Sequence, residues 1–202
     1  MNLNNKYLKG FSLIEVLVGI LLSSGVLISL TYLMGNIFNQ LSYEDVNQKI
    51  TSYGNYVLDD IAESFKEPDI DKIRIDNYDG YSIIRVEFDD NSADIKYSHN
   101  LLEGIMKDNE PIHENNNTVD QYFNDFENSN YSIVISEFKC NELGYAGNTD
   151  KYGNRPFDGS EFKNAFYVVD MQIEIYKDIK NMLEFYNVVD FQRTIFVSDE
   201  FI

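Results

Sequence analysis

Apolar residues dominate the chain near its start. Residues 11–38, which read FSLIEVLVGILLSSGVLISLTYLMGNIF, contain only Glu15 and Tyr32 as ionisable side chains. A helix of this length reaches about 42 Å, whereas the hydrocarbon core of a bilayer is about 30 Å thick. We therefore predict a membrane-spanning helix. Lys6 and Lys9 precede it and no basic residue lies within it, which places the N-terminus in the cytoplasm.

Beyond residue 38 the apolar residues continue on one side of the predicted helix. They recur at spacings of three, four or about nine, with polar residues between them. The stripe consists of Ile37, Leu41, Val46, Ile50, Tyr53, Val57, Leu58, Ile61 and Phe65. This spacing is typical of an amphipathic helix with one buried face. Because the residue before Pro68 is disfavoured in a helix, we predict one continuous helix from about Phe11 to about Phe65.

After Pro68 the pattern changes to the period of two that is typical of strands. The predicted strands cover residues 73–75, 81–88, 93–98, 101–106, 131–139, 165–176 and 182–197. Turns are expected at 77–80, 99–100 and 177–181, polar loops at 107–118 and 141–164, and either a short helix or an irregular segment at 119–126. A long helix followed by mostly antiparallel strands predicts an α+β fold, with the sheet packed on the second half of the helix.

Composition limits the partners of the chain. Its 202 residues suffice for one domain and an anchor, and its net charge is −18 with no cluster of Lys and Arg. Direct binding of nucleic acid is therefore not expected, because phosphate binding depends on clustered basic residues. The single cysteine, Cys140, cannot form a disulfide within the chain and is expected to be buried.

The apolar N-terminal segment has three interpretations. A secretory signal peptide could be cleaved near Ser23-Ser24-Gly25, but the apolar run continues past this point and contains Glu15. A plain signal anchor explains the length of the segment but gives the carboxylate no role. A carboxylate in hydrocarbon costs about 2.5 kcal/mol or more, so it requires a partner or a function.

The third interpretation accounts for each of these features. The sequence Lys9-Gly10-Phe11-Ser12-Leu13-Ile14-Glu15 resembles the class III signal of type IV prepilins. The resemblance implies that prepilin peptidase cuts after Gly10, that the new terminus at Phe11 is N-methylated, and that Glu15 is the residue for assembly. In a filament core the Glu15 carboxylate would pair with the terminal amine of a neighbouring subunit and set the axial register. The proline that many pilins have in this helix is absent between Phe11 and Phe65.

The resemblance implies a pilin-like α+β fold. Its expected parts are a cleaved leader (1–10), a transmembrane and filament-core half of the helix (11–38), an amphipathic half (39–66) and a β-rich head (67–202). The order of short strands followed by two long ones also resembles the larger minor pseudopilins of the J or PilW kind.

Motifs for catalysis are absent from the sequence. There is no CxxC, HExxH, glycine-rich phosphate loop or GxSxG, so we do not expect an enzyme. By residue type alone, Cys140 could form a catalytic Cys/His pair with His99 or His113. Both histidines, however, are expected to be solvated loop residues. No cofactor is expected apart from calcium, for which two Asp/Asn loops offer oxygen ligands. The candidate ligands are Asp89, Asp90, Asp94 and Asp150; the competing interpretation is ordinary turn chemistry.

The sequence thus predicts a non-enzymatic minor subunit of a type IV pilus or type II secretion pseudopilus, possessing one membrane span and a head outside the cytoplasm. It would start in the inner membrane and then enter the filament, where it could prime assembly at the tip. Its expected partners are prepilin peptidase, other pilins or pseudopilins, and the inner-membrane assembly platform. The alternatives are a membrane-tethered binding module that does not polymerise and a pseudopilin for DNA uptake.

Overall fold

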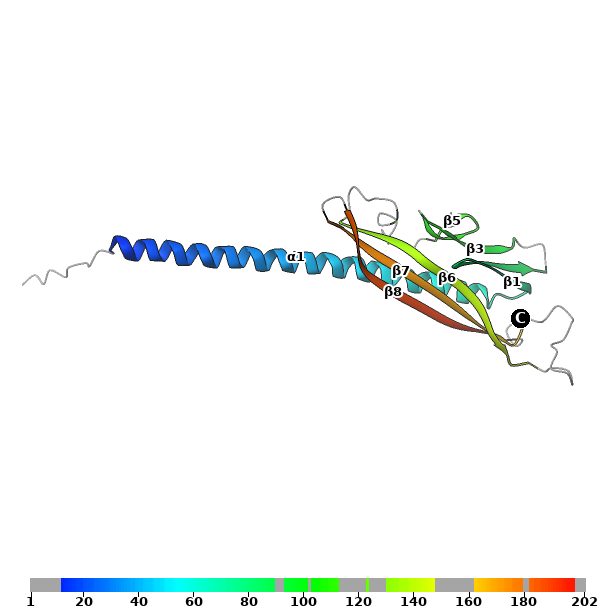
Figure 1. The fold of residues 1–202 in the computed structure, drawn as a ribbon. Coiled ribbons are helices and arrows are strands. Elements are labelled where there is room, and N and C mark those ends of the chain that lie inside the picture. The colour runs from blue at the N-terminus through cyan, green and yellow to red at the C-terminus, as the bar shows by residue number, and fades with distance from the viewer. Residues whose placement is uncertain are drawn as a thin grey trace, which may run out of the picture. The chain divides into compact units, whose positions relative to one another are not determined.

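The structure is a computed structural model, and it describes residues 12–89, 93–101, 103–112, 123, 130–147, 162–179 and 182–198 (Figure 1). The chain forms two compact units, Met1–Asp45 and Val46–Ile202. The described residues of the first unit are almost all helical. The second unit contains the rest of this helix and all of the described strands.

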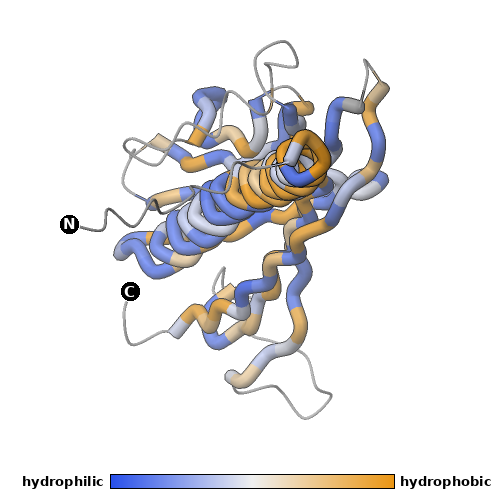
Figure 2. Tube along the Cα trace, turned by 90° about the vertical axis from the view of Figure 1, so that its left-hand side faces the viewer, coloured by the Kyte–Doolittle hydropathy of each residue, from blue (hydrophilic) through white to orange (hydrophobic). Residues whose placement is uncertain are grey.

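Helix α1 spans Leu13–Ser64, 52 residues in one continuous run. The predicted helix is therefore confirmed over its described length, and its end before Pro68 is correct within one residue. Figure 2 shows the apolar colouring of its first turns and the mixed colouring of its later ones. The predicted apolar stripe is wrong at its start, since Ile37 and Leu41 are both 55% exposed. Burial begins at Val46, where the second unit begins.

The second half of α1 buries one face against the sheet. Its buried residues are Val46, Ile50, Tyr53, Gly54, Val57, Leu58, Ile61, Ala62 and Ser64. Phe65 follows directly and is fully buried, with its ring edge-on to Tyr167 at 5.3 Å between centroids. The predicted sheet-covered face is thus confirmed from Val46 onward, and this apolar burial is the main stabilising term of the unit.

The sheet contains eight strands. They are β1 (Ile70–Tyr78), β2 (Tyr81–Phe88), β3 (Ile95–Asn100), β4 (Gly104–Lys107), β5 (Glu110–Pro111), β6 (Tyr131–Tyr145), β7 (Ala165–Ile179) and β8 (Met182–Val197). Their order is β5-β4-β3-β2-β6-β7-β8, and β1 pairs with the other side of β2. All pairs are antiparallel except β2 with β6. The α+β class and the mostly antiparallel sheet are therefore as predicted.

Two groups of strands meet at a narrow joint. In the described part of the chain, β2 and β6 share the single residue pair Tyr81↔Phe138, where the Phe138 amide donates to the Gly80 carbonyl at 3.2 Å. Three further hydrogen bonds cross here: the Tyr81 hydroxyl donates to the Ile135 carbonyl, the Cys140 amide donates to the Ser82 hydroxyl, and the side-chain amide of Asn77 donates to the Asn141 side chain at 3.5 Å. We call β1–β5 the small half and β6–β8 the long half of the sheet.

Helix α1 contacts both halves of the sheet. Toward the small half, the Ile105 amide of β4 donates to the Tyr53 hydroxyl at 2.8 Å. Toward the long half, Phe191 of β8 lies directly against Gly54. Since the strands share so little at the joint, the helix is the element that holds the two halves in one core.

Three predicted connections are wrong in position. The turn expected at 99–100 lies instead between β3 and β4, because Asn100 still pairs with Gly104, whose φ of 82° suits glycine. The loop expected from residue 107 contains β5, which returns along β4 after a turn at Asp108 and Asn109, both with positive φ. The loop expected from residue 141 begins later, since β6 continues to Tyr145.

The long half agrees with the sequence prediction more closely. The predicted strands 165–176 and 182–197 are β7 and β8, and they pair antiparallel from Ala165↔Val197 to Ile179↔Met182. The predicted segment 119–126 lies outside the described residues apart from Phe123, which is buried against Tyr53 with 5.6 Å between ring centroids.

Candidate functional site

Glu15 and Ser12 cap the start of α1. The Ser12 amide donates a hydrogen bond to the Glu15 carboxylate at 2.8 Å, and the Glu15 amide donates to the Ser12 hydroxyl at 3.2 Å. This reciprocal pair is a capping box, in which two amides that the helix itself cannot satisfy receive side-chain partners. The S-x-x-E spacing in the sequence is a signal for it, but the sequence analysis considered Glu15 only as an assembly residue.

The carboxylate therefore has a local partner and a favourable field. A negative charge in the first turn is stabilised by the partial positive charge of the helix N-terminus. One carboxylate oxygen accepts the Ser12 amide, and no second described partner is seen for this exposed side chain. Capping and pairing with a neighbouring amine are thus compatible roles for Glu15. Gly10 and Phe11, the predicted processing residues, lie outside the described residues.

Hydroxyl groups within the apolar stretch bond back to the helix itself. Ser24 donates to the Leu21 carbonyl at 2.8 Å, Ser29 donates to Gly25 at 2.9 Å, and Thr31 donates to Leu27 at 2.9 Å. Ser23 likewise donates to the Gly19 carbonyl. Each hydroxyl is thereby satisfied without water, which is what an apolar medium requires of a polar group.

The first part of α1 exposes an apolar surface on all sides. It is long and apolar enough to cross a membrane, and none of its most apolar window is buried within the chain. At Gly19, Gly25 and Gly35 an added Cβ would meet no atom within 4 Å. The apolar side chains and the small residues of this part thus have no partner in the described part of the chain.

The predicted calcium ligands do not form a described cluster. The Asp89 amide donates to the Asp69 carbonyl at 3.0 Å at the end of the β1–β2 pair, and Asp94 lies just before β3. Asp90 and Asp150 lie outside the described residues. Within the part that is described, no group of three His, Cys, Asp or Glu side chains could hold a metal ion.

Cys140 and His99 are both placed in strands. Cys140 is fully buried as expected, and burial raises the pKa of its thiol to about 12, so the thiol stays protonated at neutral pH. The prediction of a solvated loop is wrong for His99, which lies in β3 and stacks on Tyr81 with 4.2 Å between ring centroids. Burial lowers the pKa of His99 to about 4. No hydrogen bond joins Cys140 and His99, and His113 lies outside the described residues.

A polar cluster that the sequence analysis missed joins α1 to β3 and β4. Tyr97, fully buried, donates from its hydroxyl to the Asp60 carboxylate at 2.6 Å. The Lys107 ammonium lies 3.0 Å from both oxygens of the same carboxylate. Burial, and then the hydrogen bond to Asp60, raise the pKa of the Tyr97 hydroxyl well above its ordinary value of 10.0. We call these three residues the Asp60 cluster; its role is to attach the helix to the small half of the sheet.

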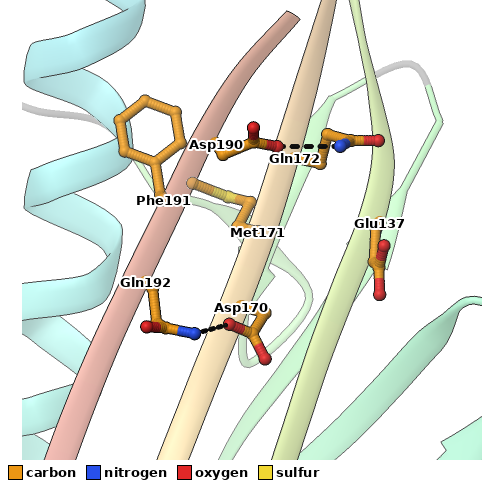
Figure 3. Close-up of a pocket in the computed structure, with 7 residues that line it drawn as sticks. All are labelled: Glu137, Asp170, Met171, Gln172, Asp190, Phe191 and Gln192. Carbon is orange, nitrogen blue, oxygen red and sulfur yellow. Dashed lines mark hydrogen bonds between the residues drawn. The ribbon is translucent and has the colours of Figure 1, made fainter.

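A polar ladder crosses the outer face of the long half (Figure 3). Gln172 donates to the Asp190 carboxylate at 2.8 Å, and Gln192 donates to the Asp170 carboxylate at 2.8 Å. These residues line an open hollow of about 400 Å³, together with Glu137, Met171 and Phe191. The sequence signal is a repeated Asp-x-Gln, at 170–172 and 190–192, which antiparallel pairing turns into two reciprocal hydrogen bonds.

The ladder is a register device rather than a reactive site. Its two amides are both engaged by carboxylates across the strands, and Glu137 is paired with Lys139 at 2.5 Å. The residues between the ladder positions, Met171 and Phe191, are buried. A slip of one residue would place carboxylates in the core, so the ladder fixes the pairing of β7 and β8.

Comparison of the chain with models of protein families, with curated proteins and with solved structures found no match. The function proposed below is therefore based on the residues of this chain and their contacts.

Proposed function

We propose that this chain is a structural subunit of a type IV filament system, a minor pilin or pseudopilin, anchored in the membrane through the first part of α1. The head would lie outside the cytoplasm, and the subunit would enter the filament after prepilin peptidase removes residues 1–10. The proposal includes no enzymatic activity and no required cofactor.

The observation that carries the proposal is the position of Glu15. It is a lone carboxylate in the first turn of α1, in the part of the helix where exposed apolar side chains extend from Leu13 to Leu41. In an ordinary membrane anchor this carboxylate would serve only as a helix cap. A subunit that must recognise the cationic terminus of a neighbour does gain from it, because an ion pair in an apolar medium has a strong dependence on register.

Two further observations support the proposal. The large apolar side chains between Leu13 and Leu41 are exposed in the described chain, as expected of a segment that is covered by lipid or by other helices. The hydroxyl groups in it are satisfied by backbone carbonyls, so the helix can move from lipid into a helix bundle without exposing unpaired polar groups.

The test is the mass of the N-terminal peptide after expression of the full chain with and without an active prepilin peptidase. With the peptidase, we expect a peptide that begins at Phe11 and carries one additional methyl group. Without it, the chain should keep residues 1–10. A Gly10→Ile substitution should block the cut, whereas Gly19→Ala, a matched glycine with open space around it, should not.

The outcomes separate the proposal from its alternatives. An uncut N-terminus in the presence of the peptidase contradicts it. Cleavage without recovery of the chain in sheared filaments would indicate the membrane-tethered module that does not polymerise.

A further inference from the structure

Strand β8 presents a long free edge to its surroundings. It is the last strand in the sheet order, and 15 of its 16 residues pair with β7 along one edge, with an irregularity in the register at Tyr186. No other described strand pairs with the second edge. An edge of this kind is a row of backbone donors and acceptors that can pair with a further strand. β8 contains neither Lys nor Pro, two residues that protect many strand edges, and the irregularity in its register is confined to Tyr186.

The free edge is apolar at one end. The first residues of β8 include four apolar side chains, Met182, Leu183, Phe185 and Tyr186, that are between 46% and 68% exposed. We call residues 182–189 the β8 tip. In the second half of the same strand Phe191, Ile195 and Val197 are buried. Large apolar side chains gathered at one place on a surface mark an interaction site, whereas scattered ones do not.

Aromatic contacts hold the tip in a defined arrangement. Phe185 lies edge-on to Tyr176 with 6.0 Å between ring centroids, and Tyr186 lies edge-on to Tyr131 at 5.8 Å. The Lys177 ammonium lies 5.7 Å from the centre of the Tyr186 ring and is thereby held against it. A preorganised surface of this kind loses little conformational entropy when a partner binds.

The charges around the tip select the partner. Carboxylates of Glu174, Glu184 and Asp190 lie on β7 and β8, and the one arginine of β8, Arg193, is engaged by Asp59 of the helix. The whole chain carries a net charge of −18, which opposes the approach of a second copy. A strand that brings basic side chains to this edge meets complementary charge.

We propose that the β8 tip receives an extended segment of another protein by strand addition. The segment pairs through its backbone with the free edge of β8, presents apolar side chains to Leu183 and Phe185, and carries Lys or Arg at alternate positions. Strand addition is a general mode of peptide recognition, in which backbone pairing gives affinity and alternate side chains give specificity. This inference does not depend on the filament function and holds for any membrane-anchored chain with this head.

The experiment uses the full chain in a non-ionic detergent and a fluorescent peptide of alternating Val and Lys. We expect the anisotropy of the peptide to rise with chain concentration, and amide hydrogen exchange in the β8 tip to slow about tenfold when the peptide is bound. A peptide of the same sequence that is N-methylated at alternate residues should bind about tenfold more weakly, because it cannot pair with the edge.

Two protein variants complete the test. Leu183→Lys with Phe185→Lys adds like charge to the tip and should weaken binding about tenfold or more. Leu143→Lys changes an exposed leucine on β6 (66%, against 51% for Leu183) and should leave binding unchanged. The methylated peptide is tested on the unaltered chain, so it remains decisive if the double variant does not fold.

Four results would overturn the proposal. One is equal binding of the methylated and unmethylated peptides. Another is equal binding of a peptide of alternating Val and Glu. The third is self-association of the full chain that the double lysine variant abolishes, because a second copy would then be the occupant. Absence of any binding by the Val/Lys peptide would likewise contradict it.

Discussion

The ring of Phe191 occupies the space in which a side chain at Gly54 would lie. A Cβ at Gly54 would be 2.4 to 2.6 Å from three atoms of the Phe191 ring. Gly54 is therefore required for the close approach of β8 to α1. We expect Gly54→Val to destabilise the head by about 1–3 kcal/mol through overpacking, measured by chemical denaturation of the full chain.

A glycine elsewhere in the same helix provides the control. Gly35 has nothing within 4 Å of an added Cβ, so Gly35→Ala should not destabilise and should favour the helix by up to about 1 kcal/mol. Combining Gly54→Val with Phe191→Ala should cost less than the sum of the two single changes, because the smaller residue at 191 makes room. Strict additivity would contradict the proposed contact.

The two roles of Glu15 can be separated by the choice of substitution. Glu15→Gln keeps an oxygen that can accept the Ser12 amide but removes the charge, whereas Glu15→Val removes both. If pairing with a neighbouring amine drives assembly, we expect both variants to be lost from sheared filaments to a similar extent. The measurement is the ratio of filament-bound to membrane-bound chain.

A capping role alone gives a different pattern. In that case Glu15→Gln would assemble like the original chain, and Ser12→Ala would be as defective as Glu15→Val. The loss of the cap would cost about 1 kcal/mol of helix stability, which can be followed by circular dichroism in detergent.

Removal of Asp60 should weaken the attachment of the helix to β3 and β4. In Asp60→Ala the buried Tyr97 hydroxyl loses its carboxylate and the partly buried Lys107 ammonium loses its counter-ion. We expect a loss of about 2–3 kcal/mol, and a smaller loss of about 1 kcal/mol for Tyr97→Phe, measured by denaturation.

An exposed ion pair serves as the comparison. Arg74 and Glu87 are 2.9 Å apart on neighbouring strands, with the Arg74 side chain half exposed. Glu87→Ala should cost between about 0 and 1 kcal/mol, as surface pairs do. Equal losses for Asp60→Ala and Glu87→Ala would mean that the Asp60 cluster has no special role.

His99 should make the head less stable in mild acid. Because its pKa is lowered from 6.5 to about 4 in the folded chain, the unfolded chain takes up the proton first as the pH falls. The contribution of His99 to the free energy of unfolding is therefore complete above pH 6.5 and is lost progressively as the pH falls toward 4. Below pH 4 it does not change further.

The pH effect is measured against His99→Phe, which keeps an aromatic ring against Tyr81 and cannot titrate. We expect the difference in melting temperature between the two chains to shift in favour of the variant as the pH is lowered from 7 to 5. A difference that is independent of pH would show that His99 has the same pKa in the folded and the unfolded chain.

The sequence allowed the helix and the long strands to be predicted because their patterns are dense. The stripe from Val46 to Ile61 repeats over several turns, and buried residues recur at every second position or so from Val169 to Ile175 in β7 and from Phe191 to Val197 in β8. The predicted burial was wrong for Ile37 and Leu41, because periodicity identifies an apolar face but does not show where a sheet begins to cover it.

The missed features depend on contacts between distant residues. Gly104 permits a turn that the sequence analysis placed at 99–100, and β6 extends through Asn141 and Glu142, whose polarity suggested a loop. The Asp60 cluster joins residues 47 positions apart, so no local sequence pattern predicts it. The capping box at Ser12 and the repeated Asp-x-Gln could have been found from their spacing alone.

The narrow joint at Tyr81 and Phe138 has a mechanical consequence. Tension applied along α1 would be transmitted to the small half of the sheet through the ion pair of Asp60 and Lys107. It would be transmitted to the long half through the ion pair of Asp59 and Arg193. The two routes start from adjacent residues of the helix and act side by side, so each half bears part of the load. Tension on the helix would therefore reach each half of the sheet directly and would not have to pass through the joint between β2 and β6.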